Sequence, residues 1–133
     1  MNEVRLTVVI DRPAREVFDF TLDPKNTPTW IDGIVEERAE PLPVRLGTIY
    51  RNQNLEGKWT EYEITALELG SMFVMSRRDG AYHVKYTITP RNGRAELEFL
   101  EWADEGELDV PFTQAAMEKL KQVMEAPAHP PLA

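Results

Sequence analysis

The sequence contains no cysteine among its 133 residues and only two histidines, His83 and His129. The absence of cysteine excludes disulfides and thiolate metal sites and is typical of a reducing compartment, so we expect a cytoplasmic protein. The first residues carry too short an apolar run for a signal peptide, and no run approaches the length of a membrane-spanning helix. Nucleotide-binding glycine loops, a serine-nucleophile elbow and EF-hand spacing are also missing, and we expect neither a cofactor nor a metal.

Basic residues are few. Fifteen Lys and Arg stand against 23 Asp and Glu, which gives a formal net charge of −8. A surface of this sign repels phosphate backbones, so nucleic acid is not an expected partner. Seven carboxylates and no base lie between Glu96 and Asp109. We interpret this run as a solvated strand face and loop, with a cation site as the lesser alternative.

The length of 133 residues indicates one domain, which we expect over residues 1–126, followed by a loose Pro-rich tail over 127–133. A strand rich in β-branched residues precedes two short helical segments, the second of which opens at Asp23-Pro24 and is interrupted at Pro28. Six further strands and a terminal amphipathic helix follow. The predicted strands are 3–10, 34–40, 47–55, 58–67, 71–78, 81–89 and 94–102, and the predicted terminal helix is 111–126.

A meandering sheet of this size with a large apolar face must curl or be covered. One amphipathic helix cannot cover both of its sides. The predicted fold is therefore α+β: a strongly curved antiparallel sheet of six to seven strands that grips the C-terminal helix, with the two short helices after the first strand closing one end.

Six segments of the chain, in their order and spacing, are similar to those of a known family. They are VVIDRPAREVFDF (8–20), DPKNTPTW (23–30), LGTIYR (46–51), YEITALELG (62–70), YTITPRNGRAEL (86–97) and MEKLKQVMEA (117–126). Together they resemble the START-like, or helix-grip, superfamily (SRPBCC), and within it the bacterial polyketide cyclase/dehydrase-like group. The resemblance covers nearly the whole chain and implies a cavity between sheet and helix. Members of the superfamily include lipid carriers, aromatic polyketide cyclases, hormone receptors and co-chaperone domains.

Large aromatic and methionine side chains are the candidates for the inward face of the sheet. A core built for packing alone prefers Leu, Ile, Val and Phe, whereas buried tyrosines need hydrogen-bond partners and methionines adapt their shape. This set favours an amphipathic cavity over a filled core with tyrosine hydroxyls at its rim. The predicted lining residues are Trp30, Tyr50, Tyr62, Phe73, Met75, Tyr82, Tyr86, Phe99, Met117 and Leu120. Trp30 is expected either to close the core beside Met117 or to border the cavity mouth.

Strand alternation places the ionisable candidates on the outer face. His83 has the opposite parity to its apolar neighbours and is expected to face water. Glu61 and Glu63 could form an acid/base pair, but they are also expected on a solvated face. Trp59 is expected on the same face, because it is an even number of residues from both glutamates. A bulge, or its place at the strand end, could turn it inward. No catalytic residue is therefore assigned.

Three functions remain open. The favoured one is binding or carriage of an apolar, aromatic or lipid-like small molecule in the cavity. The alternatives are a cyclase/dehydratase-type enzyme acting on a polyketide-like substrate and a co-chaperone-like protein-interaction module. A cavity of about 300 Å³ or more supports ligand binding. A filled interior with an exposed apolar patch supports the interaction module, and a buried Glu or His with a shifted pKa supports the enzyme.

Overall fold

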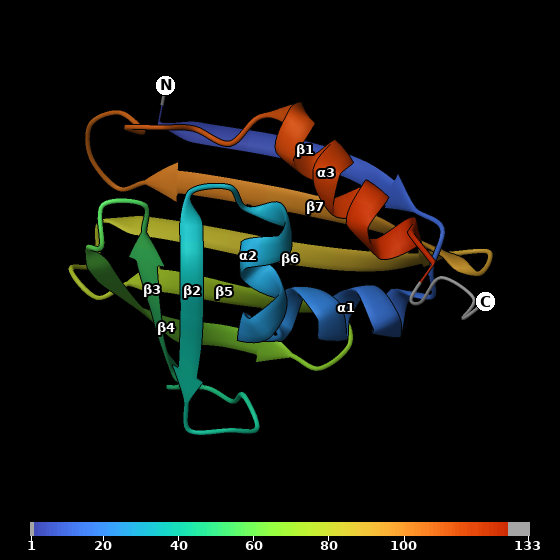
Figure 1. Ribbon diagram of the computed structural model, residues 1–133, viewed down its shortest axis with the longest axis horizontal. Coiled ribbons are helices and arrows are strands. Elements are labelled where there is room, and N and C mark those ends of the chain that lie inside the picture. Colours follow the sequence, from blue (N-terminus) through green and yellow to red (C-terminus); the bar gives the residue numbers. More distant parts are fainter. Residues whose placement is uncertain (1, 128–133) are drawn as a thin grey trace, which may run out of the picture.

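The structure is a computed structural model that describes residues 2–127. Within that range the chain forms seven strands, three α-helices and one 3₁₀ turn (Figure 1). The strands are β1 (Glu3–Ile10), β2 (Ile34–Glu40), β3 (Ile49–Asn54), β4 (Trp59–Glu68), β5 (Met72–Arg77), β6 (Tyr82–Arg91) and β7 (Arg94–Ala103). The helices are α1 (Ala14–Leu22), α2 (Thr27–Trp30) and α3 (Gln114–Glu125), and the 3₁₀ turn is η1 (Pro24–Asn26). No helix in this range is long and apolar enough to cross a membrane.

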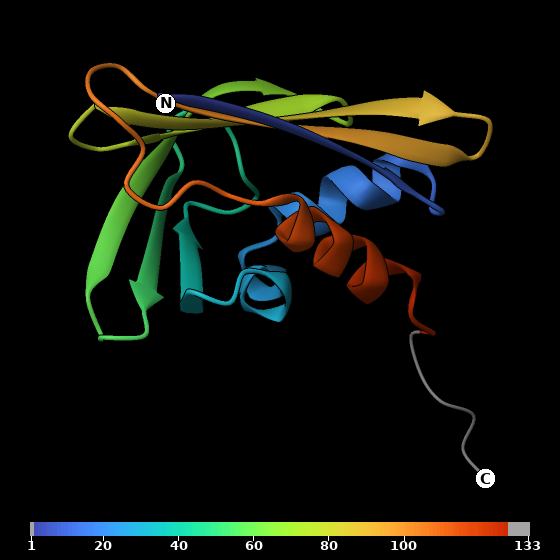
Figure 2. The same ribbon diagram turned by 90° about the horizontal axis from the view of Figure 1, so that it is seen from above.

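The strands form one antiparallel sheet in the order β1-β7-β6-β5-β4-β3-β2. The first strand returns to pair with the last, from Glu3 opposite Trp102 to Ile10 opposite Ala95. The sheet bends strongly between β5 and β2, and α1, α2 and α3 all lie on its concave side (Figure 2). This arrangement confirms the predicted curved antiparallel sheet with a C-terminal helix.

The hairpin between β6 and β7 shows how local chemistry sets the register. Asn92 and Gly93 both have positive φ, at 53° and 83°, as a two-residue hairpin turn requires. Pro90 lies inside β6 opposite Ala95, although the predicted strand ends before it. A proline is tolerated here because it lies at the end of the ladder, next to the turn.

The two prolines after α1 start helical turns. The Asp23 side chain accepts a 3.0 Å hydrogen bond from the Lys25 N–H, and Pro24 occupies the first turn of η1. Pro28 does not interrupt the segment as predicted. It occupies the first turn of α2, where a missing N–H costs no helical hydrogen bond. The helix ends at Trp30, which is thereby held against the concave face.

The terminal helix is shorter than predicted. It begins at Gln114 instead of 111, because Thr113 has an extended backbone. Its buried residues are Met117, Leu120 and Met124, and this face packs against β1 and α2. Most of the predicted loose tail, including His129, lies outside the described residues.

Candidate functional site

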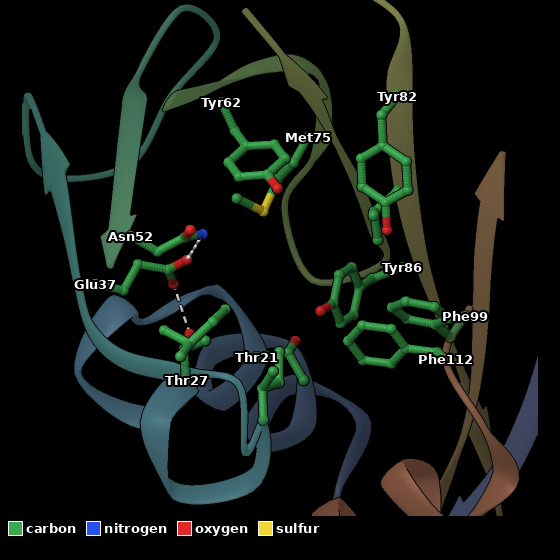
Figure 3. A pocket seen from close by; sticks show the side chains of 13 residues that line it. Thr21, Thr27, Glu37, Asn52, Tyr62, Met75, Tyr82, Tyr86, Phe99 and Phe112 are labelled. Carbon is green, nitrogen blue, oxygen red and sulfur yellow. Dashed lines mark hydrogen bonds between the residues drawn. The ribbon is translucent and has the colours of Figure 1, made fainter. Parts of the chain in front are cut away.

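A cavity of about 80 Å³ lies between the concave face of the sheet and the short helices (Figure 3). One side is aromatic, with contributions from β4, β6, β7 and the segment before α3. The other side is polar and comes from α1, α2, β2 and β3. The labelled wall residues are Thr21, Thr27, Glu37, Asn52, Tyr62, Met75, Tyr82, Tyr86, Phe99 and Phe112. The cavity is smaller than the 300 Å³ expected for a ligand site.

A second hollow adjoins this cavity and shares Tyr62 and Tyr82 with it as walls. Its volume is about 250 Å³. Acidic side chains of the segment between β7 and α3 line it, namely Glu105, Glu107 and Asp109, together with the cation Arg77. The guanidinium of Arg77 lies 5.6 Å from the centroid of the Tyr82 ring. The hollow beside the cavity therefore has a predominantly acidic wall.

Glu37 is the ionisable group of the cavity that the sequence did not reveal. One carboxylate oxygen accepts a 2.6 Å hydrogen bond from the Thr27 hydroxyl, and the other accepts a 3.1 Å hydrogen bond from the Asn52 amide. Burial raises the pKa of Glu37 to about 6, although both hydrogen bonds act to lower it. Glu37 therefore changes protonation just below neutral pH.

A β-bulge in β2 explains why Glu37 points inward. The register between β2 and β3 shifts between Ile34 and Glu36, which leaves Val35 as the extra residue. Ile34 and Glu37 consequently both line the cavity although they are three residues apart. Simple alternation from Ile34 would have sent Glu37 outward. The available signal was the pair Glu36-Glu37, because one of two consecutive strand residues must face the concave side.

Tyr62 and Tyr86 present free hydroxyl groups to the cavity. Both rings point into it, Tyr62 from β4 and Tyr86 from β6 (Figure 3). Within residues 2–127 neither hydroxyl has a hydrogen-bond partner, and no fully buried side-chain polar atom in that range lacks one. The two oxygens are therefore open to the cavity space. Burial raises the pKa of Tyr62 and of Tyr86, so both remain neutral donors at physiological pH.

The hydroxyls of the other two tyrosines donate hydrogen bonds to groups of the protein itself. Tyr50 donates to the carbonyl of Leu22, and Tyr82 donates a 2.8 Å hydrogen bond to Glu101. Burial raises the pKa of both phenols. Tyr82 therefore lines the cavity with its ring but not with a free hydroxyl, and only Tyr62 and Tyr86 among the tyrosines offer their hydroxyls to the cavity within residues 2–127.

Glu101 corrects the interpretation of the acidic run as a solvated surface. It is 1% exposed and lies on the inward face of β7 with Leu97 and Phe99. Its two oxygens accept hydrogen bonds from the Tyr82 hydroxyl and the Phe112 N–H. The sequence indicated this position, because Glu101 is two residues after Phe99 and four after Leu97 and so faces the same side of the strand.

The chain matches one known protein family over nearly its whole length. The family model for polyketide cyclase / dehydrase and lipid transport matches residues 1–128. The chain belongs to this family. No curated protein sequence matches it.

Several solved structures share the fold of this family member. Protein CV1439 of Chromobacterium violaceum is 18% identical with a TM-score of 0.69, covering 96% of this chain and 100% of that chain. Protein MLL2253 of Mesorhizobium loti is 16% identical with a TM-score of 0.71, covering 92% and 96%. The di-domain ARO/CYC protein BexL of the BE-7585A biosynthetic pathway is 15% identical with a TM-score of 0.63, covering 77% and 36%. Identities this low show a shared fold alone.

In this polyketide cyclase/dehydrase family member, five of the ten predicted lining residues reach the cavity: Tyr62, Met75, Tyr82, Tyr86 and Phe99. The other five lie in the core instead: Trp30, Tyr50, Phe73, Met117 and Leu120. Trp30 is 2% exposed, and its ring meets Tyr86 and Phe112 edge-on at 6.4 and 6.1 Å between centroids. It packs behind two cavity walls without itself lining the space.

The outer face holds a polar cluster around His83. His83 lies on the outer face, as predicted, but its side chain is only 17% exposed. Its Nδ1 lies 2.7 Å from the Ser76 hydroxyl and its Nε2 lies 3.0 Å from the Asp104 carboxylate. The ring also stacks on Trp102 at 4.9 Å. His83 is thus fixed by neighbours and does not reach the cavity.

Trp59 and the paired glutamates also belong to the outer face. Trp59 is 41% exposed, and the Arg38 guanidinium lies 5.5 Å from its ring centroid. The pairing of β3 with β4 is regular from Trp59 onward, so the ring is not turned inward. Glu61 accepts a 2.7 Å hydrogen bond from Arg51, and Glu63 lines an outer groove with Ser76 and His83. Neither glutamate lines the cavity.

Proposed function

We propose that the protein binds a small, mostly apolar, uncharged molecule that carries a carbonyl or a similar oxygen acceptor. The observation that carries this proposal is the pair of unpartnered hydroxyls of Tyr62 and Tyr86 on an otherwise aromatic wall. Pockets of this type combine apolar area with a few placed polar groups that orient the ligand. An oxygen atom of the ligand would accept the hydrogen bonds that these two hydroxyls do not donate within the protein.

The charge of the site narrows the ligand class. Within residues 2–127 no Lys, Arg or His lines the cavity, whereas Glu37 does. The adjoining hollow is lined by Glu105 and Asp109 as well as by the cation Arg77. A carboxylate ligand such as a fatty acid would meet like charges in a poorly solvated space. We therefore favour a neutral aromatic or alicyclic ligand over an anionic lipid.

The small volume of the cavity also limits which ligands can bind. The cavity of about 80 Å³ favours a compact ligand, because even a cavity of about 150 Å³ holds only a single benzene ring. A larger ligand would have to displace Met75, whose unbranched chain adapts readily, or extend past Tyr62 and Tyr82 into the adjoining hollow of about 250 Å³.

A cyclase/dehydratase-type enzyme is the second candidate, and Glu37 is the observation that favours it. A carboxyl whose pKa is raised to about 6 by burial inside a cavity is suited to general acid or base chemistry. Family membership is compatible with both candidates. The interaction-module alternative has less support, because the most exposed large apolar residues, Leu55, Leu69 and Val110, lie in three separate connections of the chain.

Three ligands of matched shape test the binding proposal: indane, 2-indanone and indane-2-carboxylate. Titrations followed by NMR should show that 2-indanone binds tighter than indane and that the carboxylate binds weakest. Phe substitutions at Tyr62 and Tyr86 should each weaken 2-indanone binding by roughly 3- to 10-fold, the value of one hydrogen bond, with little change in stability.

The other two tyrosines provide the controls. Tyr50→Phe and Tyr82→Phe each remove a hydrogen bond made to the protein. They should lower the melting temperature while largely preserving the preference for 2-indanone over indane. If all four variants behaved alike, or if indane bound as tightly as 2-indanone, the binding proposal would be wrong.

A further inference from the structure

We propose that Glu37 is a catalytic base that removes a proton from the carbon next to a ligand carbonyl, while Tyr62 and Tyr86 hold the carbonyl oxygen. The inference rests on the proposed function, because it uses the same cavity and the same oxygen acceptor. It adds a reaction class, enolisation and proton transfer at carbon, and it gives each of three residues a role.

The arrangement of the cavity supports these roles. Glu37 approaches from β2, with Thr27 and Asn52 each occupying one of its oxygens, so each oxygen keeps a further lone pair for a proton (Figure 3). Tyr62 and Tyr86 approach from β4 and β6 on the aromatic side. A ligand between them would have its carbonyl oxygen at the phenols and its adjacent carbon towards the carboxylate.

The chemical step is balanced without any further reactant. The carboxylate of Glu37 takes the proton, the carbon–hydrogen electron pair becomes a carbon–carbon double bond, and the carbonyl oxygen becomes an enolate oxygen. The two neutral phenols donate hydrogen bonds to that oxygen, and their donation strengthens as its charge develops. Glu37 then returns the proton to the same carbon or to another carbon of the enolate, so the product is the starting ketone or an isomer.

Within residues 2–127 the cavity walls offer no other base. No histidine, lysine or second carboxylate of this range lines the space. Glu101 lies behind Tyr82 with both oxygens occupied by Tyr82 and Phe112. A carboxylate base facing neutral donors is an arrangement known from other enzymes that enolise ketones.

The groups around Glu37 define the expected pH dependence. The titratable groups that interact with it electrostatically are Tyr50, Tyr62 and Tyr86, from β3, β4 and β6, and the pKa of each is raised. From α2, the Thr27 hydroxyl donates a hydrogen bond to Glu37. All three phenols stay neutral between pH 5 and pH 8. Of these four groups, Glu37 alone changes charge in this range.

The test is hydrogen–deuterium exchange at the carbons next to the carbonyl of 2-indanone, followed by NMR in D₂O with and without protein. We expect protein-dependent exchange that rises with pH, with a midpoint near the Glu37 pKa of about 6, and then levels off. Glu37→Gln keeps the shape of the side chain and should lower this exchange by roughly 10²-fold, the usual contribution of a general base. Tyr62→Phe should lower it by roughly 10-fold.

Two controls separate this inference from the binding proposal. Glu63→Gln changes a glutamate of the outer face and should leave the exchange rate unaltered. Chemical-shift changes on titration report binding of 2-indanone independently of exchange. Binding without protein-dependent exchange, or equal exchange in the Glu37→Gln variant, would overturn the catalytic role and leave the binding proposal standing. Absence of binding would overturn both.

Discussion

The Tyr82 hydroxyl donates a 2.8 Å hydrogen bond to one oxygen of the Glu101 carboxylate, whose other oxygen accepts a 2.6 Å hydrogen bond from the Phe112 N–H. Through this buried carboxylate, the segment before α3 is tied to the concave face of the sheet. Phe112 is thereby stacked on Phe99 with 4.5 Å between ring centroids, and both rings form part of the cavity wall. Glu101 acts on the shape of the cavity without lining it.

The first prediction concerns this connection. Glu101→Ala leaves the Tyr82 hydroxyl and the Phe112 N–H without their partner, and each unpaired buried group costs about 1–3 kcal/mol. We therefore expect the free energy of unfolding in urea to fall by about 3 kcal/mol. Glu98→Ala is the matched control on the same strand, because Glu98 forms a 2.8 Å pair with the half-exposed Arg5 and should cost less than about 1 kcal/mol. Equal losses in the two variants would show that the buried carboxylate is not a structural connection.

The second prediction concerns pH. The pKa of Glu37 rises from 4.5, the ordinary value of a glutamate side chain, to about 6 in the folded protein. Below both values Glu37 is protonated in either state. As the pH rises through this window the unfolded chain releases its proton first, so the folded state loses stability, by about 2 kcal/mol in total.

Glu37→Gln does not titrate and should not show this loss. Urea unfolding of both proteins at pH 4.5 and pH 7 should therefore reveal a stability difference that shifts by about 2 kcal/mol in favour of the variant at the higher pH. Taking the difference between the proteins cancels the other carboxylates. A difference that does not change with pH would mean that burial does not raise the pKa of Glu37.

The sequence predicted the sheet well because strand alternation and turn residues are local signals. β1 and β2 were predicted with the bounds observed, and the Asn92-Gly93 turn fixed the last hairpin. The cavity was harder to predict because it depends on irregular features. The bulge at Val35 reverses the parity that would have placed Glu37 outside. Parity places a side chain on the inner face, but it does not say whether a residue such as Tyr50 meets packed atoms or open space.

The third prediction compares two tryptophans. Trp30 is 2% exposed between Tyr86 and Phe112, whereas Trp59 is 41% exposed on the outer face. Trp30→Ala should lower the free energy of unfolding by about 3–5 kcal/mol, because the surrounding core cannot refill so large a volume. Trp59→Ala should cost less than about 1 kcal/mol. Thermal and urea denaturation of the two variants provide the measurement, and similar losses would contradict the packing described for Trp30.

The last prediction concerns the outer cluster of His83. Ser76 is 8% exposed, and its hydroxyl lies 2.7 Å from His83 Nδ1 and 2.9 Å from the Thr65 hydroxyl. Because Ser76 and His83 share a largely desolvated hydrogen bond, the double-mutant cycle of Ser76→Ala and His83→Ala should give a coupling energy of about 1 kcal/mol. The contact of His83 with Asp104 is different, since the Asp104 side chain is 52% exposed. Asp104→Asn should therefore change stability by less than about 1 kcal/mol. A coupling near zero between Ser76 and His83, measured by urea denaturation, would mean that the hydrogen bond to Ser76 does not help to hold the imidazole in place.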